Sequence, residues 1–142
     1  MQYQAELVID VEQLNQQDKF IREGIVTFNA PFIGSKPDRY SIYVKDNDGT
    51  IIGGAIVFAH NSSIYIDVLW VADNFRGIGI GSEILAKIES ETIKRGIPAS
   101  TVDTFSFQAE TFYIKQGYQQ IGTIQNYIEG HDRIYLRKLL IK

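Results

Sequence analysis

Three glycines at alternating positions, Gly77, Gly79 and Gly81, lie between a β-rich segment and an amphipathic segment. Glycine lets the backbone curl and removes side chains that would keep a ligand at a distance. Where such a turn opens a helix, unpaired amides and the helix dipole converge on one point, which attracts a phosphate. Arg76 adds a fixed positive charge beside it. The pattern predicts an anion site formed by Arg76, Gly77, Ile78, Gly79, Ile80, Gly81 and Ser82.

Two known kinds of phosphate loop are compared with this turn. No Gly-Lys-Ser/Thr follows the glycines, which excludes a P-loop. A dinucleotide site is nearer, because Gly77 and Gly79 match its first two glycines and Asp103 stands where a ribose-binding acid is expected. Ser82 replaces the third glycine, however, and antiparallel hairpins are expected upstream in place of βαβ units. A dinucleotide-binding oxidoreductase fragment therefore stays as an alternative.

The glycine turn needs a strand before it and a helix after it. Residues 64–71 are nearly all β-branched or aromatic apart from Asp67, which predicts a buried central strand. The helix has an apolar face that recurs at helical spacing, and Gly96 and Pro98 end it. Its apolar positions are Ile80, Ile84, Leu85 and Ile88. A strand over 99–105 follows, parallel to 64–71 with a right-handed crossover.

The remaining segments complete an α/β fold. The signal Asn47-Asp48-Gly49 predicts a hairpin turn, and Pro31 predicts the end of the first helix. Strands are expected at 5–9, 40–46, 51–59, 118–127 and 133–140, and helices from about Phe20 to Pro31 and at 108–116. This order predicts one domain over residues 1–142, with a mixed sheet of about six to seven strands flanked by helices.

Composition narrows the class of function. The chain has 142 residues, a net charge of −3 and no cysteine. Disulfides, thiolate metal sites and a cysteine nucleophile are excluded, and with two histidines we expect no metal cofactor. The acidic balance argues against a nucleic-acid partner. No apolar run approaches the roughly 20 residues that span a bilayer, and no signal-peptide pattern is visible, so we expect a cytoplasmic protein without a membrane partner.

Two separated motifs resemble the GNAT superfamily of acyl-CoA-dependent N-acyltransferases. Residues 76–81, Arg-Gly-Ile-Gly-Ile-Gly, resemble its Arg/Gln-x-x-Gly-x-Gly/Ala signature. Residues 71–75 resemble the Val-x-Pro-x-Tyr/Phe approach to that signature, with Asp73 in place of the proline. Ala109 and residues 112–118 resemble the family's Ala…Tyr-x-Lys-x-Gly-Phe/Tyr helix. The expected order of elements also resembles the family fold over nearly the whole chain.

The resemblance implies a fold, a co-substrate and a reaction. In the family the fourth strand carries a bulge and splays from the fifth, which makes a V-shaped gap. Pantetheine would pair there with the backbone around Leu69 and Val71, and the pyrophosphate of acetyl-CoA would lie on the amides from Arg76 to Ser82. A neutral amine attacks the thioester directly, with no covalent enzyme intermediate. Phe105, Phe107 and Phe112 are expected in the core or in the pantetheine wall.

The resemblance makes Tyr113 the candidate general acid, which protonates the departing sulfur. A phenol with a pKa near 10 can donate to a developing thiolate at neutral pH. The other interpretation is that Tyr113 only packs its short helix. Asp67 is the candidate base or amine-binding group, with Glu110 a weaker one. Asp67 would otherwise accept hydrogen bonds or lie on a solvated face, and a water chain would then take the proton.

The acceptor cannot be identified from these residues beyond a small-molecule or peptide amine. In the family the first helix and the loop after it shape the acceptor site, which points to Phe28, Asn29 and Phe32 as candidate substrate-binding residues. The family Asn seven residues before the tyrosine is Ser106 here, and Gln108 is the candidate to make its cofactor contact. A non-catalytic acyl-CoA-binding or sensing module is kept as an alternative, and a homodimer is left open.

Overall fold

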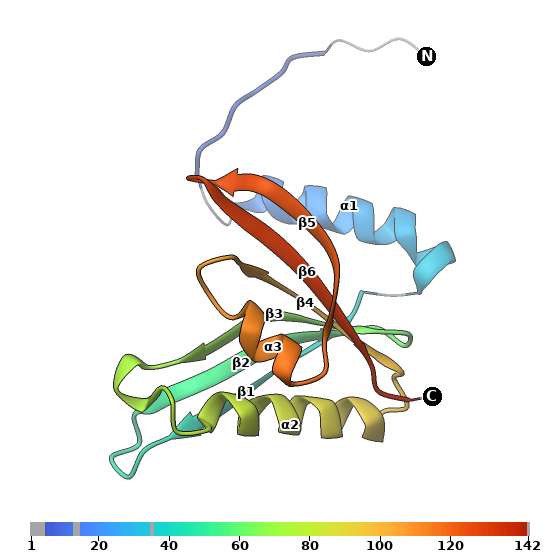
Figure 1. Ribbon diagram of the computed structural model, residues 1–142. Coiled ribbons are helices and arrows are strands. Elements are labelled where there is room, and N and C mark those ends of the chain that lie inside the picture. Colours follow the sequence, from blue (N-terminus) through green and yellow to red (C-terminus); the bar gives the residue numbers. More distant parts are fainter. Residues whose placement is uncertain (1–4, 13–14, 35, 142) are drawn as a thin grey trace. The chain divides into compact units, whose positions relative to one another are not determined.

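A computed structural model describes residues 5–12, 15–34 and 36–141. The chain divides into two compact units, Met1–Lys36 and Pro37–Lys142. The helices are α1 (Gln16–Ile33), α2 (Ile80–Lys94) and α3 (Glu110–Lys115), with a 3-10 turn at Asp73–Phe75. The strands are β1 (Asp38–Lys45), β2 (Ile51–Ala59), β3 (Ile64–Val71), β4 (Ala99–Phe105), β5 (Gln119–Ile128) and β6 (His131–Leu139). The first unit holds α1, and the second holds every other element (Figure 1).

The first unit corrects two expectations. Residues 5–9 form no strand in the described chain, although their side chains favour β structure. Helix α1 does not end before Pro31 but continues to Ile33, and Gly34 closes it by donating to the Ala30 carbonyl at 2.9 Å. A proline in the last turn removes one hydrogen bond and has a helical φ, so the helix tolerates it there. Asn15 caps the other end by accepting from the Asp18 amide.

The second unit is one mixed sheet in the order β1-β2-β3-β4-β6-β5. All neighbours are antiparallel except β3 and β4, which are parallel, as the sequence predicts. The first hairpin turns as predicted at residues 46–50, where the Asp46 carboxylate accepts from the amides of Asp48 and Thr50. The six strands fall within the predicted range and confirm the α/β fold with a mixed sheet and flanking helices.

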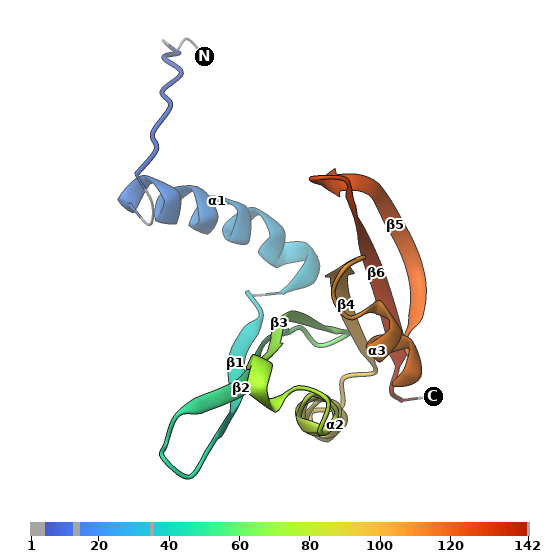
Figure 2. The same ribbon diagram turned by 60° about the vertical axis from the view of Figure 1, so that its left-hand side comes forward.

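Helices α2 and α3 pack on one face of this sheet. The apolar residues Ile84, Leu85 and Ile88 of α2 are buried, which confirms the face read from their spacing. Gln116, just after α3, donates to the Ser82 hydroxyl of α2 at 3.0 Å, so the two helices are neighbours. Figure 2 shows α2 under β1–β3, and α3 beside the long β5–β6 hairpin. The hydrophobic core, to which the sheet and both helices contribute, contains Val57, Ile66, Val102, Tyr118 and Leu136, among others.

Two glycines of β2 let the end of β3 lie close to its neighbours. Gly53 is opposite Val71 and Gly54 is opposite Trp70 in the ladder. A Cβ atom on Gly54 would meet the Ile42 carbonyl oxygen of β1 at 2.7 Å, and one on Gly53 would meet the Trp70 carbonyl oxygen at 3.1 Å. Gly54 therefore keeps β2 close to β1, and Gly53 keeps it close to the last residues of β3.

We predict that Gly54→Ala lowers the free energy of unfolding by about 2 kcal/mol, because strands β1 and β2 must separate to admit the methyl group. Gly122→Ala is the matched control, since a Cβ there meets nothing within 4 Å. Urea denaturation of both variants checks the expectation. Equal stability of the two variants would contradict it.

Candidate functional site

Strands β3 and β4 separate halfway along their length. Within the described chain their parallel pairing runs only from Ile64 opposite Ser100 to Ile66 opposite Val102. At the same point the register between β3 and β2 shifts, because Ile66 and Val68 face adjacent residues of β2 and Asp67 is the extra residue. Such a β-bulge bends its strand and increases the local twist. The structure thus has the V-shaped splay expected between these two strands, and the bulge falls on Asp67 itself.

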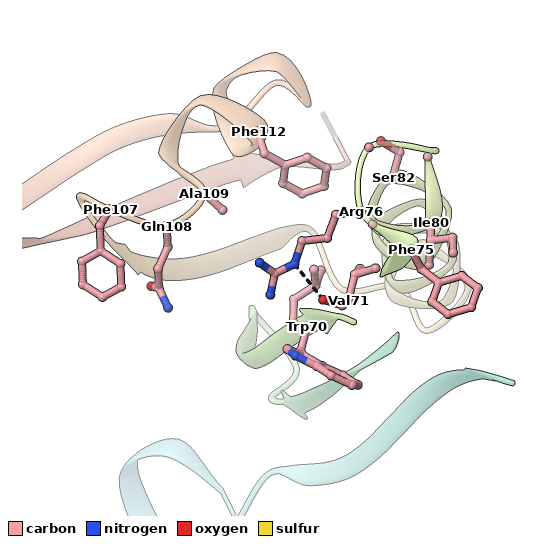
Figure 3. A pocket seen from close by; sticks show the side chains of 14 residues that line it. Trp70, Val71, Phe75, Arg76, Ile80, Ser82, Phe107, Gln108, Ala109 and Phe112 are labelled. Atoms are coloured by element: carbon pink, nitrogen blue, oxygen red, sulfur yellow. Dashed lines mark hydrogen bonds between the residues drawn. The ribbon is translucent and has the colours of Figure 1, made fainter. Parts of the chain in front are cut away.

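A cavity of about 670 Å³ lies beside the separated strands. Its lining comes from three places: the end of β3, the glycine turn with the first turn of α2, and the segment from the end of β4 into α3 (Figure 3). The lining residues are Leu69, Trp70, Val71, Phe75, Arg76, Gly77, Gly79, Ile80, Gly81, Ser82, Phe107, Gln108, Ala109 and Phe112. Every predicted cofactor-binding residue is among them except Ile78.

The glycine turn has the conformation that an anion site requires. Gly77 and Gly79 have φ values of 78° and 94°, a region that other residues rarely adopt. Gly79 is the N-cap of α2 and has no side chain to satisfy the first amides of the helix. Gly81 faces the ring of Phe112, which a Cβ atom would meet at 3.6 Å. The start of α2 therefore presents backbone amides to a cavity whose other wall is α3.

Arg76 is a positively charged residue in the cavity lining. Its Nε donates to the Val71 carbonyl at 2.9 Å, and its Nη1 lies 3.1 Å from the Asp73 carboxylate. Figure 3 shows the guanidinium between Val71 and the β4–α3 segment, inside the space that the lining encloses. The side chain is 60% exposed, so the ion pair contributes little to stability. The charge is available to a ligand at little cost.

Gln108 is fixed by its oxygen and free at its nitrogen. Its Oε1 accepts from the Phe105 amide at 2.8 Å and from the Thr104 hydroxyl at 3.2 Å. The Thr104 hydroxyl in turn accepts from the Ala109 amide. Because the backbone donor identifies the oxygen, the amide nitrogen is the end that remains for a ligand. Ser106 is occupied elsewhere, since its hydroxyl accepts from the Asp132 amide of β6 at 3.1 Å.

Tyr113 is buried next to the cavity and does not line it. It is 4% exposed and packs against Phe112 and Tyr118, with ring centroids 5.2 and 5.6 Å away. Burial raises the pKa of the Tyr113 phenol to about 12, and the negative charge of Asp103 adds to the rise. The phenol therefore keeps its proton at every physiological pH. Its packing agrees with both interpretations of this residue, the general acid and the core side chain.

Asp67 differs from its expected environment. The sequence predicts a buried strand over 64–71, but only Ile64 and Ile66 are buried, and Asp67 and Val68 are exposed. The bulge turns the strand at this point, and the absence of β4 pairing uncovers it. The cost of burying a carboxylate is thus no reason to assign Asp67 a function. Its position at the fork remains the argument for the prediction.

The predicted acceptor residues lie in the other unit. Phe28, Asn29 and Phe32 are on α1, where the centroids of the two phenylalanine rings are 6.2 Å apart. Their assignment stays a prediction. Trp70, Phe75 and Ala109 line the cavity and were not predicted to do so. Each is next in sequence to a predicted residue, and this adjacency is the one feature of the sequence from which its place in the lining could have been predicted.

The structure also bears on a metal site and on a membrane-spanning helix. In the ranges 5–12, 15–34 and 36–141, no three His, Asp or Glu residues are grouped so that they could hold a metal ion. No helix of that part of the chain combines the length and apolar character needed to cross a membrane.

We predict that Gln108→Met lowers the free energy of unfolding by about 1 to 2 kcal/mol, because the Phe105 amide and Thr104 hydroxyl lose their acceptor. Gln108→Glu is the control, since it keeps an oxygen in the same place and should retain wild-type stability near pH 7. Urea denaturation at that pH compares the three proteins. A Met variant as stable as the wild type would show that these bonds do not hold the β4–α3 segment.

Comparison with known proteins identifies the family of this chain. Residues 38–120, more than half of the chain, match the acetyltransferase (GNAT) domain. The chain is 31% identical over 103 residues to blasticidin-S acetyltransferase of Streptomyces morookaense, covering 71% of this chain and 76% of that protein. The structure of an acetyltransferase from Bacillus cereus superposes with a TM-score of 0.80, at 28% identity and coverage of 94% and 97%.

A more distant structure shares the fold. It is an aminoglycoside 6′-N-acetyltransferase complexed with coenzyme A, which superposes with a TM-score of 0.64 at 19% identity and covers 75% of each chain. The matched range 38–120 contains the fork, the glycine turn and α3. These elements are not those of a dinucleotide-binding oxidoreductase, and Asp103, its expected ribose ligand, is instead paired with Arg133 at 3.0 Å. The chain is an acyltransferase and belongs to the GNAT acetyltransferase family.

Proposed function

We propose that this acyltransferase moves the acetyl group of acetyl-CoA to a primary amine by direct attack, with no covalent enzyme intermediate. The observation that carries the proposal is the fork, which leaves the β4-facing backbone edge of residues 67–71 without a strand partner in the described chain. An extended ligand with amide groups can add to such an edge as an extra strand would. Pantetheine has two amides, and the same cavity continues to an anion site.

The proposed cofactor position uses each part of the cavity lining. The pantetheine arm pairs with the backbone of Leu69 and Val71. The pyrophosphate lies on the amides of the glycine turn and the start of α2, from Gly77 through Ile78 to Ser82, with the Arg76 charge beside it. The Gln108 nitrogen donates to a carbonyl of the arm, which is the contact that Ser106 does not make. The lining on both sides of the fork supports this arrangement.

Tyr113 is the proposed general acid. A phenol with a pKa of about 12 stays protonated, so it can donate a hydrogen bond to the sulfur as negative charge develops there. The thiolate of a thiol with a pKa near 8.5 is a weaker base than this phenolate, so complete proton transfer to the sulfur is uphill and the hydrogen bond acts mainly by stabilising the charge while the C–S bond is breaking. Asp67 or a chain of waters is proposed to take the proton from the amine.

The proposed acceptor is a small molecule or peptide with a primary amine. Two of the similar proteins, blasticidin-S acetyltransferase and an aminoglycoside 6′-N-acetyltransferase, are named for small-molecule amines, which favours such an acceptor for this chain too. We propose that Phe28, Asn29 and Phe32 contribute to its binding and that residues 1–142 act as one acetyltransferase domain. No metal takes part in the proposed reaction.

For the proposed cofactor, we predict that calorimetric titration detects binding of acetyl-CoA and no binding of NADH at equal concentration. Both ligands carry a pyrophosphate, but only acetyl-CoA has the pantetheine amides that pair with the β3 edge. Binding of NADH alone, or of neither ligand, would reject the proposed cofactor site.

A pair of glycine variants localises the binding. Gly79→Val should abolish acetyl-CoA binding, because the side chain strains a residue with φ of 94° and projects where the phosphate would lie. Gly130→Val, at φ of 78° in the β5–β6 turn, imposes a similar strain away from the cavity and should bind acetyl-CoA normally. Retained binding in the Gly79 variant would place the phosphate elsewhere.

A second prediction concerns Tyr113→Phe, which should lower kcat for thiol release by about 100-fold or more with little change in acetyl-CoA affinity. The assay uses the fastest amine from a panel of polyamines, aminoglycosides and amino acids. Because the Tyr113 pKa is raised to about 12, the ratio of wild-type to variant kcat should stay constant from pH 6 to pH 10.

The matched control is Tyr118→Phe. The Tyr118 hydroxyl donates to the Ser100 hydroxyl at 2.7 Å within the core, so its loss should reduce stability and leave kcat close to wild type at a temperature where the variant is folded. An unchanged kcat in Tyr113→Phe would remove Tyr113 from its role. A ratio that falls above pH 9 would show that the Tyr113 phenol loses its proton there, so that its pKa in the working enzyme lies well below 12.

A further inference from the structure

The Val71 carbonyl is the backbone acceptor on which two interactions converge. In the structure it accepts from Arg76 Nε at 2.9 Å. In the proposed function it pairs with an amide of the pantetheine arm. Figure 3 shows the guanidinium on the cavity side of this carbonyl, where the arm would run. The arm and the side chain therefore compete for the same space.

Arg76 is held in this place by a second contact. Its Nη1 is 3.1 Å from the Asp73 carboxylate, three residues earlier on the 3-10 turn. Asp73 stands where the family approach has a proline, which could not make such a pair. Asp73 thus orients the guanidinium toward the Val71 carbonyl. Both side chains are mostly exposed, 60% for Arg76 and 87% for Asp73, so the pair is weak enough to break.

The glycine turn offers Arg76 a better partner when a pyrophosphate is bound. The turn begins directly after Arg76, and Gly77, Gly79 and Gly81 all line the cavity. A guanidinium binds phosphate through paired, charge-assisted hydrogen bonds, which are stronger than one bond to a neutral carbonyl. A donor with a pyrophosphate therefore compensates for the release of Arg76 from Val71. A donor with pantetheine alone must break the same bond without that compensation.

We propose that Arg76, positioned by Asp73, selects acyl donors that carry a pyrophosphate, because it blocks the Val71 carbonyl until phosphate draws it away. This inference rests on the proposed function. It adds that Arg76 has opposite effects on two parts of one ligand: it favours binding of the nucleotide end and opposes binding of the pantetheine end. Opposite signs in one variant are not expected of a residue that only binds phosphate.

The test compares CoA and pantetheine binding to the wild type and to Arg76→Met, which keeps an unbranched apolar stem without the guanidinium, its charge or its donors. CoA is titrated calorimetrically, and pantetheine is measured by its displacement of CoA. We expect Arg76→Met to weaken CoA binding about tenfold, for a lost charged hydrogen bond, and to strengthen pantetheine binding about threefold, for a removed competitor. Lys87→Met is the matched control, because Lys87 is an exposed cation on α2 outside the cavity lining. It should change neither affinity.

A further variant isolates the role of Asp73. Asp73→Asn leaves Arg76 intact but without its anchor, so pantetheine binding should strengthen while CoA binding does not weaken. Pantetheine that binds Arg76→Met no better than the wild type would overturn the inference, even if CoA binding falls. Absence of CoA binding in the wild type would instead reject the proposed function itself, so the two failures are distinguishable.

Discussion

The bulge at Asp67 is the constraint on which the rest of the site depends. One extra residue in β3 shifts its register against β2, and the parallel pairing with β4 stops at the residue before it. Up to Ile66 the strand is an ordinary buried member of the sheet, and after it the strand has an unpaired edge. An unpaired edge inside a sheet is costly unless its polar groups find partners. In the proposed complex the amides of the pantetheine arm would supply them.

The position of the glycine turn follows from the same geometry. Strand β3 ends at Val71, and the chain then has a 3-10 turn and the glycine turn before α2 begins at Ile80. Helix α2 is anchored under the sheet by Ile84, Leu85 and Ile88, so its first turn is fixed relative to the fork. Gly81 lets the Phe112 ring of α3 approach this first turn. The two sides of the cavity, at the glycine turn and at α3, are therefore held by one packed core, although they come from different segments.

Local sequence patterns were sufficient for most of this arrangement. Strands 64–71, 51–59 and 99–105 have their predicted bounds, and the glycine turn opens the predicted helix. Glycines, a hairpin signal and helical spacing act over a few residues, so they are readable along the chain. The expectations that failed depend on which segments, distant in the sequence, pair with one another. Residues 5–9 have a β-rich composition and no strand partner, and Asp67 was placed in a buried strand because the loss of β4 pairing has no local signal. Pro31 shows that a local rule can also be overridden, since a last-turn proline sacrifices only one bond.

Cofactor binding and chemistry make different demands on this fold. The proposed binding uses mainly backbone groups and one charge, so it would tolerate a lining in which Ser106 replaces an asparagine and Gln108 offers the donor. The proposed chemistry uses a single hydroxyl, that of Tyr113, whose properties depend on the side chains that surround it. Burial between Phe112 and Tyr118 raises the pKa of Tyr113 and keeps the proton in place, while Phe112 lies in the cavity wall one residue away. A buried phenol beside the cavity wall stays protonated, so it could donate to the sulfur of a bound thioester. The same packing that stabilises the core thus keeps the phenol protonated, so a core role and the proposed catalytic role for Tyr113 are compatible.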